Sequence, residues 1–309
     1  MLMSFYKNNK KEVLTIQLIS QILGKIKLNC APQEPQWAHV TLDITTRGFS
    51  TGTIKCNNIY FEIEANLANN IITIRTTDNE NNIQMTDGKS VRDYYYEIIT
   101  VTQDLGLDIT INTTPQEMET KTPFEADTDH HHYNSETALK ILKWFQFAKD
   151  TELKFIAPLR NRKVYPGLFW GTFDVSCILV FNSHEPFPDD SKVIERAAFD
   201  EHMVEFGFWL GDDHFDHPTF FVLPYPFVIG EELQVTDDFP GGSYFSSEMA
   251  EYVLEIKTEI DSADSEEILR FFHTALKQTA GDLDAPDVNY IYKELKMEAN
   301  LRSNRSDSL

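Results

Sequence analysis

The chain has 309 residues, of which 41% are hydrophobic and 25% are charged, a composition typical of a globular protein with a sizeable core. Its 49 acidic and 27 basic residues give a formal net charge of −22. A surface of this sign repels phosphate backbones and anionic lipids, so we expect neither a nucleic acid nor a membrane as a partner. Solubility is the simplest reason for the charge, and a cationic ligand or partner is the alternative.

The cysteines and the apolar segments exclude further classes. Cys30, Cys56 and Cys177 are far apart and show no CxxC spacing, which argues against a disulfide scaffold or a cysteine zinc site. The first residues lack the apolar segment of a signal peptide, and no run approaches the roughly 20 apolar residues of a membrane span. We therefore expect a cytoplasmic protein.

The first part of the chain predicts two helices around a group of strands. Apolar residues three and four apart predict a helix over residues 13–28. Ser90 and Asp93 have the spacing of a capping box and predict a second helix, which ends before Gly106. Alternating apolar and polar residues predict strands over residues 37–46, 59–67, 71–76 and 107–112.

The second part of the chain repeats this order of elements. A helix is predicted from about residue 135 to the residue before Pro158, and a last helix is predicted after Asp264. Between them, strands are predicted over residues 168–181, 207–211, 219–226 and 251–257. The pattern predicts an α+β protein with two lobes of mostly antiparallel sheet packed with helices. We place the lobes at residues 1–114 and 135–298, a connection at 115–134 and a frayed tail at 299–309.

The segment FEADTDHHHYN draws attention to its aspartates and histidines. Asp127, Asp129 and His130 are residue types that bind a divalent metal or act as acids and bases, but their spacing matches no specific metal motif. The structural alternative is that the acidic residues favour the start of the next helix, with Asn134 or Ser135 as its cap. All three interpretations stay open at this point.

Four further segments carry candidate site residues. In LFWGTFD, Gly171 permits a close approach, and a buried Asp174 needs a partner. Arg47 is suited to clamp a carboxylate or phosphate, or to pair with an internal acid. Glu201 and His202 are a carboxylate–imidazole pair, for which we assume a helix. The loop DDHFDHP resembles a metal site by composition alone.

Seven segments in order resemble a family of soluble, mostly bacterial proteins known only as a domain of unknown function. They are QILGKIKL, ITTRGFST, SVRDYY, FEADTDHHHYN, LFWGTFD, GFWLG and PYP, and the resemblance extends from about Gln17 to Ala280. The resemblance implies no known activity. It points to a set of positions for a site: Arg47, Asp127, Asp129, His130, Tyr133, Trp170, Gly171, Asp174, Trp209 and Tyr225.

These observations lead to a functional hypothesis. We expect a small molecule to bind in a cleft between the lobes, with no cofactor, in a protein that is either a binding protein or an acid–base enzyme. Its catalytic candidates are His130, Asp127, Asp129 and Asp174. Its ligand-binding candidates are Arg47, Tyr133, Trp170, Trp209 and Tyr225. A metal-dependent hydrolase that uses Asp127, Asp129 and His130, and an acidic interaction protein without catalysis, are the alternatives.

Overall fold

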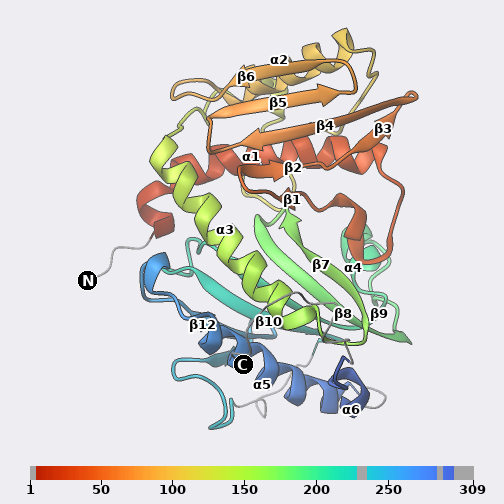
Figure 1. The fold of residues 1–309 in the computed structure, drawn as a ribbon, viewed down its shortest axis with the longest axis vertical. Helices are drawn as coiled ribbons and strands as arrows, with labels where there is room; N and C mark the ends of the chain where they lie inside the picture. Colours follow the sequence, from red (N-terminus) through yellow and green to blue (C-terminus); the bar gives the residue numbers. More distant parts are fainter. Residues whose placement is uncertain (1–4, 228–234, 284–287, 296–309) are drawn as a thin grey trace, which may run out of the picture.

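The computed structural model describes residues 5–227, 235–283 and 288–295 (Figure 1). The described strands form two antiparallel sheets of six strands each, which lie one beyond the other along the long axis of the molecule. The long helix α3 (Ser135–Ile156) runs from the first sheet to the second. The predicted α+β class is therefore confirmed.

The first sheet and its helices come from the first part of the chain. Its strands follow one another in space nearly as they do in sequence, β1-β2-β4-β5-β6, and β3 also pairs with β4. The elements in chain order are α1 (Phe5–Cys30), η1 (Pro35–Val40), β1 (Asp43–Ile44), β2 (Gly48–Ser50), β3 (Ile54–Cys56), β4 (Ile59–Asn66), β5 (Ile71–Thr76), β6 (Glu80–Gln84), α2 (Val91–Asp104) and η2 (Phe124–Ala126).

The second sheet has the order β11-β12-β10-β9-β8-β7, so that only its last two strands depart from chain order. Helix α5 packs on β9, β10 and β12. The elements after α3 are β7 (Arg162–Phe169), β8 (Asp174–His184), α4 (Val193–Ala198), β9 (Glu201–Trp209), β10 (Thr219–Tyr225), β11 (Tyr244–Ser246), β12 (Glu251–Glu255), η3 (Ile260–Ser262), α5 (Ser265–Asp282) and α6 (Val288–Ile291).

The predicted helix caps and the hairpin are confirmed. Ser90 and Asp93 form a reciprocal capping box at the start of α2, which satisfies backbone N–H groups that have no partner in the first turn. The side chain of Asn134 accepts hydrogen bonds from two backbone N–H groups of α3. Asn70 takes a left-handed backbone between β4 and β5, a conformation that asparagine adopts more readily than most residues. These signals act over a few residues, which is why sequence alone reveals them.

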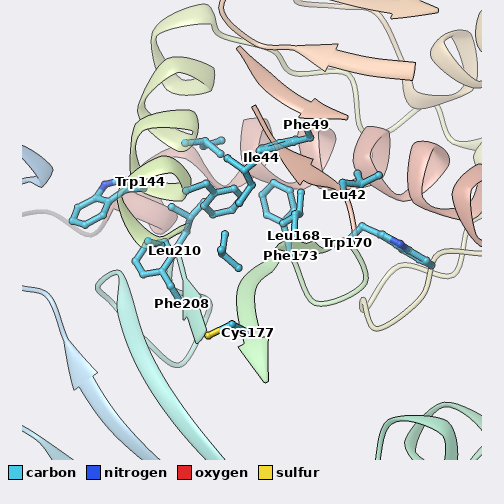
Figure 2. Close-up of a cluster of buried hydrophobic side chains, with 14 of the residues drawn as sticks. Leu42, Ile44, Phe49, Trp144, Leu168, Trp170, Phe173, Cys177, Phe208 and Leu210 are labelled. Carbon is cyan, nitrogen blue, oxygen red and sulfur yellow. The ribbon is translucent and has the colours of Figure 1, made fainter. Parts of the chain in front are cut away.

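The larger hydrophobic cluster of the described residues joins the two sheets (Figure 2). The ring of Phe49 on β2 contacts the rings of Phe145 on α3 and Phe173 before β8. Phe145 in turn contacts Phe208 on β9, so aromatic rings connect both sheets through α3. Figure 2 shows the side chains of Phe49, Phe173 and Phe208 between the strands of the first sheet and those of the second. The predicted lobe boundaries stay a prediction, and residues 299–309 lie outside the described residues.

Four expectations about secondary structure are wrong. The strand expected over residues 168–181 is interrupted at residues 170–173, which form the turn between β7 and β8. Residues 37–40 belong to η1 and not to a strand. An alternating pattern indicates only that one side of the segment is buried, and a segment that is not a strand can also satisfy it. Residues 107–112 show the expected alternation of buried and exposed side chains, but they form no strand. Glu201 and His202 lie at the start of β9 and not on a helix, so their side chains point to opposite faces. No helix in the described part of the chain is long and apolar enough to cross a membrane.

Candidate functional site

A cavity of about 770 Å³ lies against the face of the second sheet that α3 and α5 do not cover. Its other walls come from α1, η1, α4, residues 116–120 and the turn between β7 and β8. A volume of this size suits a small-molecule ligand. Because α1 and residues 116–120 precede α3 in the chain, segments from both parts of the molecule enclose it.

Strand alternation divides the second sheet into two chemically different faces. On β8, Cys177 and Val175 join the aromatic core, whereas Asp174 lines the cavity. On β9, Phe206 and Phe208 join the core, whereas Glu205 lines the cavity. Side chains of successive strand residues point to opposite faces, so one sheet supplies an apolar core surface and a polar cavity floor.

Four carboxyl groups gather around this floor: Glu117, Asp174, Glu205 and Glu251. Partial desolvation of its carboxyl group at the cavity, and then the negative charge of Asp174, raises the pKa of Glu117 to about 7, although the residue as a whole is exposed. The same two causes, in the same order, raise the pKa of Glu205 and of Glu251 to about 8. Asp174 is buried, Glu205 and Glu251 are half-buried, and Glu117 is exposed. Acids this close together in a partly solvated space cannot all be charged at low cost, so part of the cluster holds protons near neutral pH.

Asp174 lies at the centre of the cluster and is only 6% exposed. The hydroxyls of Thr172 and Ser176 donate hydrogen bonds to its two carboxylate oxygens. Burial raises the pKa of Asp174, and the bonds from Ser176 and Thr172 oppose that rise. The partner that a buried aspartate requires is thus a pair of hydroxyls and not a cation.

The structure holds Glu117 in place through its neighbours. The buried Gln21 of α1 accepts a hydrogen bond from the backbone N–H of Gln116 (2.9 Å) and donates one to the Gln116 carbonyl (2.8 Å). Glu117 itself adopts a left-handed backbone with φ of 54°. Such a conformation costs free energy in a residue other than glycine and is found where surrounding structure enforces it.

Aromatic side chains form much of the cavity wall. Trp170 donates its indole N–H to the Val40 carbonyl (2.9 Å), and its ring lies over Gly24, where a Cβ would stand 2.2 Å from the ring. Trp209 packs on Phe221 with ring centroids 4.9 Å apart. Its buried Nε1 has no hydrogen-bond partner among the described residues. Cavity walls of this kind bind flat or cationic groups.

A histidine–aspartate pair lies beside the cavity. His130 lines the cavity, and its Nδ1 is 2.8 Å from Oδ2 of Asp127. Asp127 is 1% exposed, and its Oδ1 accepts the backbone N–H groups of Asp129 and His130. Burial acts against the charged form of Asp127, but the hydrogen bonds from His130 lower its pKa overall. The aspartate therefore fixes the orientation of the imidazole, which leaves Nε2 as its second functional nitrogen.

The predicted site residues fall into two groups. His130, Asp174, Trp170 and Trp209 line the cavity, and Asp127 orients His130 from behind. Four candidates do not line it: Arg47, Asp129, Tyr133 and Tyr225. Tyr133 is buried and donates its hydroxyl to Asn70, while Tyr225 belongs to a small aromatic cluster beside the cavity. Arg47 and Asp129 are exposed.

Sequence reasoning missed Glu117, Glu205 and Glu251. Glu205 carries a readable signal, because it is an acidic residue within the apolar alternation of β9, between Met203 and Gly207 on the same face. Glu251 begins an apolar strand in the same way. Glu117 lies in a polar connection and has no comparable signal.

The predicted metal chemistry has no matching geometry. Within residues 5–227, 235–283 and 288–295, no group of three or more His, Cys, Asp or Glu side chains is arranged to hold a metal ion. Asp129 is exposed and does not line the cavity, and Nδ1 of His130 already contacts Asp127. The described geometry therefore gives no support to the hydrolase alternative that combines Asp127, Asp129 and His130 around a metal.

The fold and the cavity define an α+β protein with two antiparallel sheets and an acidic, aromatic-walled cavity. The model of DUF5996, a family of unknown function, matches residues 3–289 of the chain. The chain belongs to this family, and the expected resemblance to a domain of unknown function is confirmed. No curated protein and no solved structure matches it.

Proposed function

We propose that the protein binds a small molecule in the cavity beside the second sheet. The observation that carries the proposal is the cavity itself, which has about 770 Å³ of space, three tryptophans in its wall and four carboxyl groups around its floor. A protein that needed only a stable core would gain by filling this space with apolar side chains, because cavities and buried acids both reduce stability.

A test compares the chain with a variant whose cavity is filled. Ala198 lines the cavity from α4, whereas its neighbour Ala197 is exposed. A diverse panel of metabolites is screened for compounds that raise the Tm of the wild-type chain. We expect Ala198→Trp to abolish the shift and Ala197→Trp to preserve it. A shift that survives Ala198→Trp unchanged, or the absence of any stabilising compound, argues against the proposal.

Acid–base catalysis on the bound molecule is the second candidate function. It is favoured by the pKa of Glu117, which is raised to about 7, and by the oriented imidazole of His130 in the same cavity. A carboxyl group with a pKa near 7 accepts and donates protons efficiently at neutral pH. NMR of each stabilising compound during incubation tests for turnover. We expect conversion to stop in His130→Gln; compounds that persist unchanged with wild-type protein support binding alone.

A further inference from the structure

The charge of the cavity wall is strongly one-sided. Of the described residues that line the cavity, eight are aspartate or glutamate, and one is a lysine. That lysine, Lys10, already pairs with Asp213 at 2.6 Å. A concave surface with charges of one sign concentrates ligands of the opposite sign. The cavity therefore favours cations and repels phosphates and carboxylates.

The carboxyl groups at the floor have no cationic partner within the described part of the chain. Across the described residues, none of the ion pairs involves Glu117, Asp174, Glu205 or Glu251. Oε2 of Glu251 is buried and lacks any hydrogen-bond partner in the described part of the chain. A buried acceptor without a partner costs free energy, which a ligand donor at this position would recover.

The carboxyl groups are spread over the floor and do not converge on one point. Glu251 is on β12 and Glu205 is on β9, with β10 between them. Two strand spacings separate their backbones by about 10 Å. Because no cluster of the described acids is arranged for a metal ion, a single small cation cannot pair with all of them. A longer ligand with a positive charge at each end matches this distribution.

The aromatic wall suits the same kind of ligand. Trp170, Trp209 and Phe221 border the space above the carboxyl groups. Indole and phenyl faces attract ammonium groups and also cover the alkyl chain between them. The anionic floor and the aromatic wall together favour a molecule that carries positive charge and also has an apolar chain.

We propose that the cavity binds a linear organic diamine or polyamine, whose ammonium groups pair with Glu205 and Glu251 while its alkyl chain lies against Trp209 and Phe221. This proposal rests on the proposed function, because it names the ligand class of the same cavity. Binding shifts protons as well, since an ammonium group beside Glu205 or Glu251 favours the carboxylate and releases a proton near pH 7.5.

Isothermal titration of the full chain with 1,5-diaminopentane and with spermidine tests the proposal. We expect binding of both, at least tenfold weaker binding of pentylamine, and at least a hundredfold weaker binding of 1,5-pentanediol. Glu205→Gln and Glu251→Gln should each weaken diamine binding at least tenfold. The exposed Glu259→Gln, a matched change outside the cavity, should alter it less than twofold. Sodium chloride should weaken binding through screening.

The wild-type chain supplies a readout that does not depend on variants. Titration in buffers of different ionisation enthalpy should reveal proton release on diamine binding at pH 7.5. Equal affinity for the diol, absence of proton release, or stoichiometric magnesium or calcium that competes with the diamine overturns the proposal. Stabilisation by uncharged compounds that Ala198→Trp abolishes, without diamine binding, overturns the ligand class and leaves the proposed function intact. No stabilising compound of any kind overturns both.

Discussion

The carboxylate of Glu117 lies against the backbone of Gly171, in the position that a side chain on this residue would occupy. A Cβ added to Gly171 would stand 2.1 Å from Oε2 of Glu117 and 3.2 Å from its carboxyl carbon. The same turn is held from the other side, because the Gly171 carbonyl accepts a hydrogen bond from Gln17 of α1 at 2.8 Å. Two segments more than 50 residues apart are thus fitted together at the cavity wall, with glycine as the residue that permits the contact.

Gly171→Ala should change the site more than the fold. The added methyl group displaces the Glu117 carboxylate, which is the end of a flexible side chain, so we expect a stability loss of about 1 kcal/mol, the low end of overpacking costs. Ligand affinity should fall severalfold, and the fall should be absent in a Glu117→Gln background. Denaturant unfolding and titration measure the two effects. A loss of stability with unchanged affinity contradicts the role given to the contact.

Gln21→Leu tests how residues 116–120 are held. The substitution keeps the approximate size of the side chain but leaves the N–H and carbonyl groups of Gln116 without their partner. We expect a loss of about 2 kcal/mol in the free energy of unfolding, typical of unsatisfied buried polar groups. Hydrogen exchange at Gln116 and Glu117 should accelerate by at least tenfold. Unchanged exchange at these amides would show that other contacts hold the segment.

Glu205→Gln should alter the pH dependence of stability. Burial raises the pKa of Glu205 to about 8 in the folded chain, whereas an unfolded glutamate titrates near 4.3. The folded state therefore binds more protons between these values, and its free energy of unfolding decreases as pH rises through that window. The variant lacks this decrease. We expect it to match the wild type near pH 4 and to be more stable by on the order of 3 kcal/mol at pH 8.5.

Urea unfolding of both proteins from pH 4 to 8.5 measures that difference. Other titrating groups are common to both chains, so the difference between the curves isolates Glu205 and the neighbours that it influences, Asp174 and Glu251. A difference that stays constant over the whole range contradicts a raised pKa.

Asp127 and Asp129 should respond differently to the same change. Asp127 is buried and accepts hydrogen bonds from His130 and from two backbone N–H groups, whereas Asp129 is exposed. We expect Asp127→Ala to cost about 2 kcal/mol and Asp129→Ala less than about 0.5 kcal/mol. Thermal and urea unfolding give both values. Equal losses of stability in the two variants would mean that each aspartate acts only through its negative charge near the start of α3, and not through its hydrogen bonds.

Local sequence signals determined most of the secondary structure. Ser90 with Asp93, Asn134 and the Asn69–Asn70 turn act within three or four residues, so the chain needs no tertiary partner to express them. Alternation also identified β10 and part of β8, but the strand expected over residues 207–211 covers only the end of β9. Alternation failed at residues 107–112, where the buried positions are real but no neighbouring strand pairs with the backbone.

Part of the candidate site was also visible in the sequence. His130, Trp170, Asp174 and Trp209 lie in segments rich in aromatic and acidic residues, and all four line one cavity. Arg47, Tyr133 and Tyr225 lie in comparable segments and do not line it, because a segment's composition does not say which side of the backbone faces an open space.

The acidic cluster is a product of the tertiary structure alone. Glu117, Glu205 and Glu251 come from a connection and two strands, and only strand register and the fit of Glu117 over Gly171 bring them around Asp174. Their raised pKa values follow from that placement, since burial and the nearness of another carboxylate are properties of position. The sequence by itself determined the helices, the hairpin and the acidic, aromatic character of the chain. Long-range packing decided where that character is concentrated, because no short-range interaction links residues so far apart.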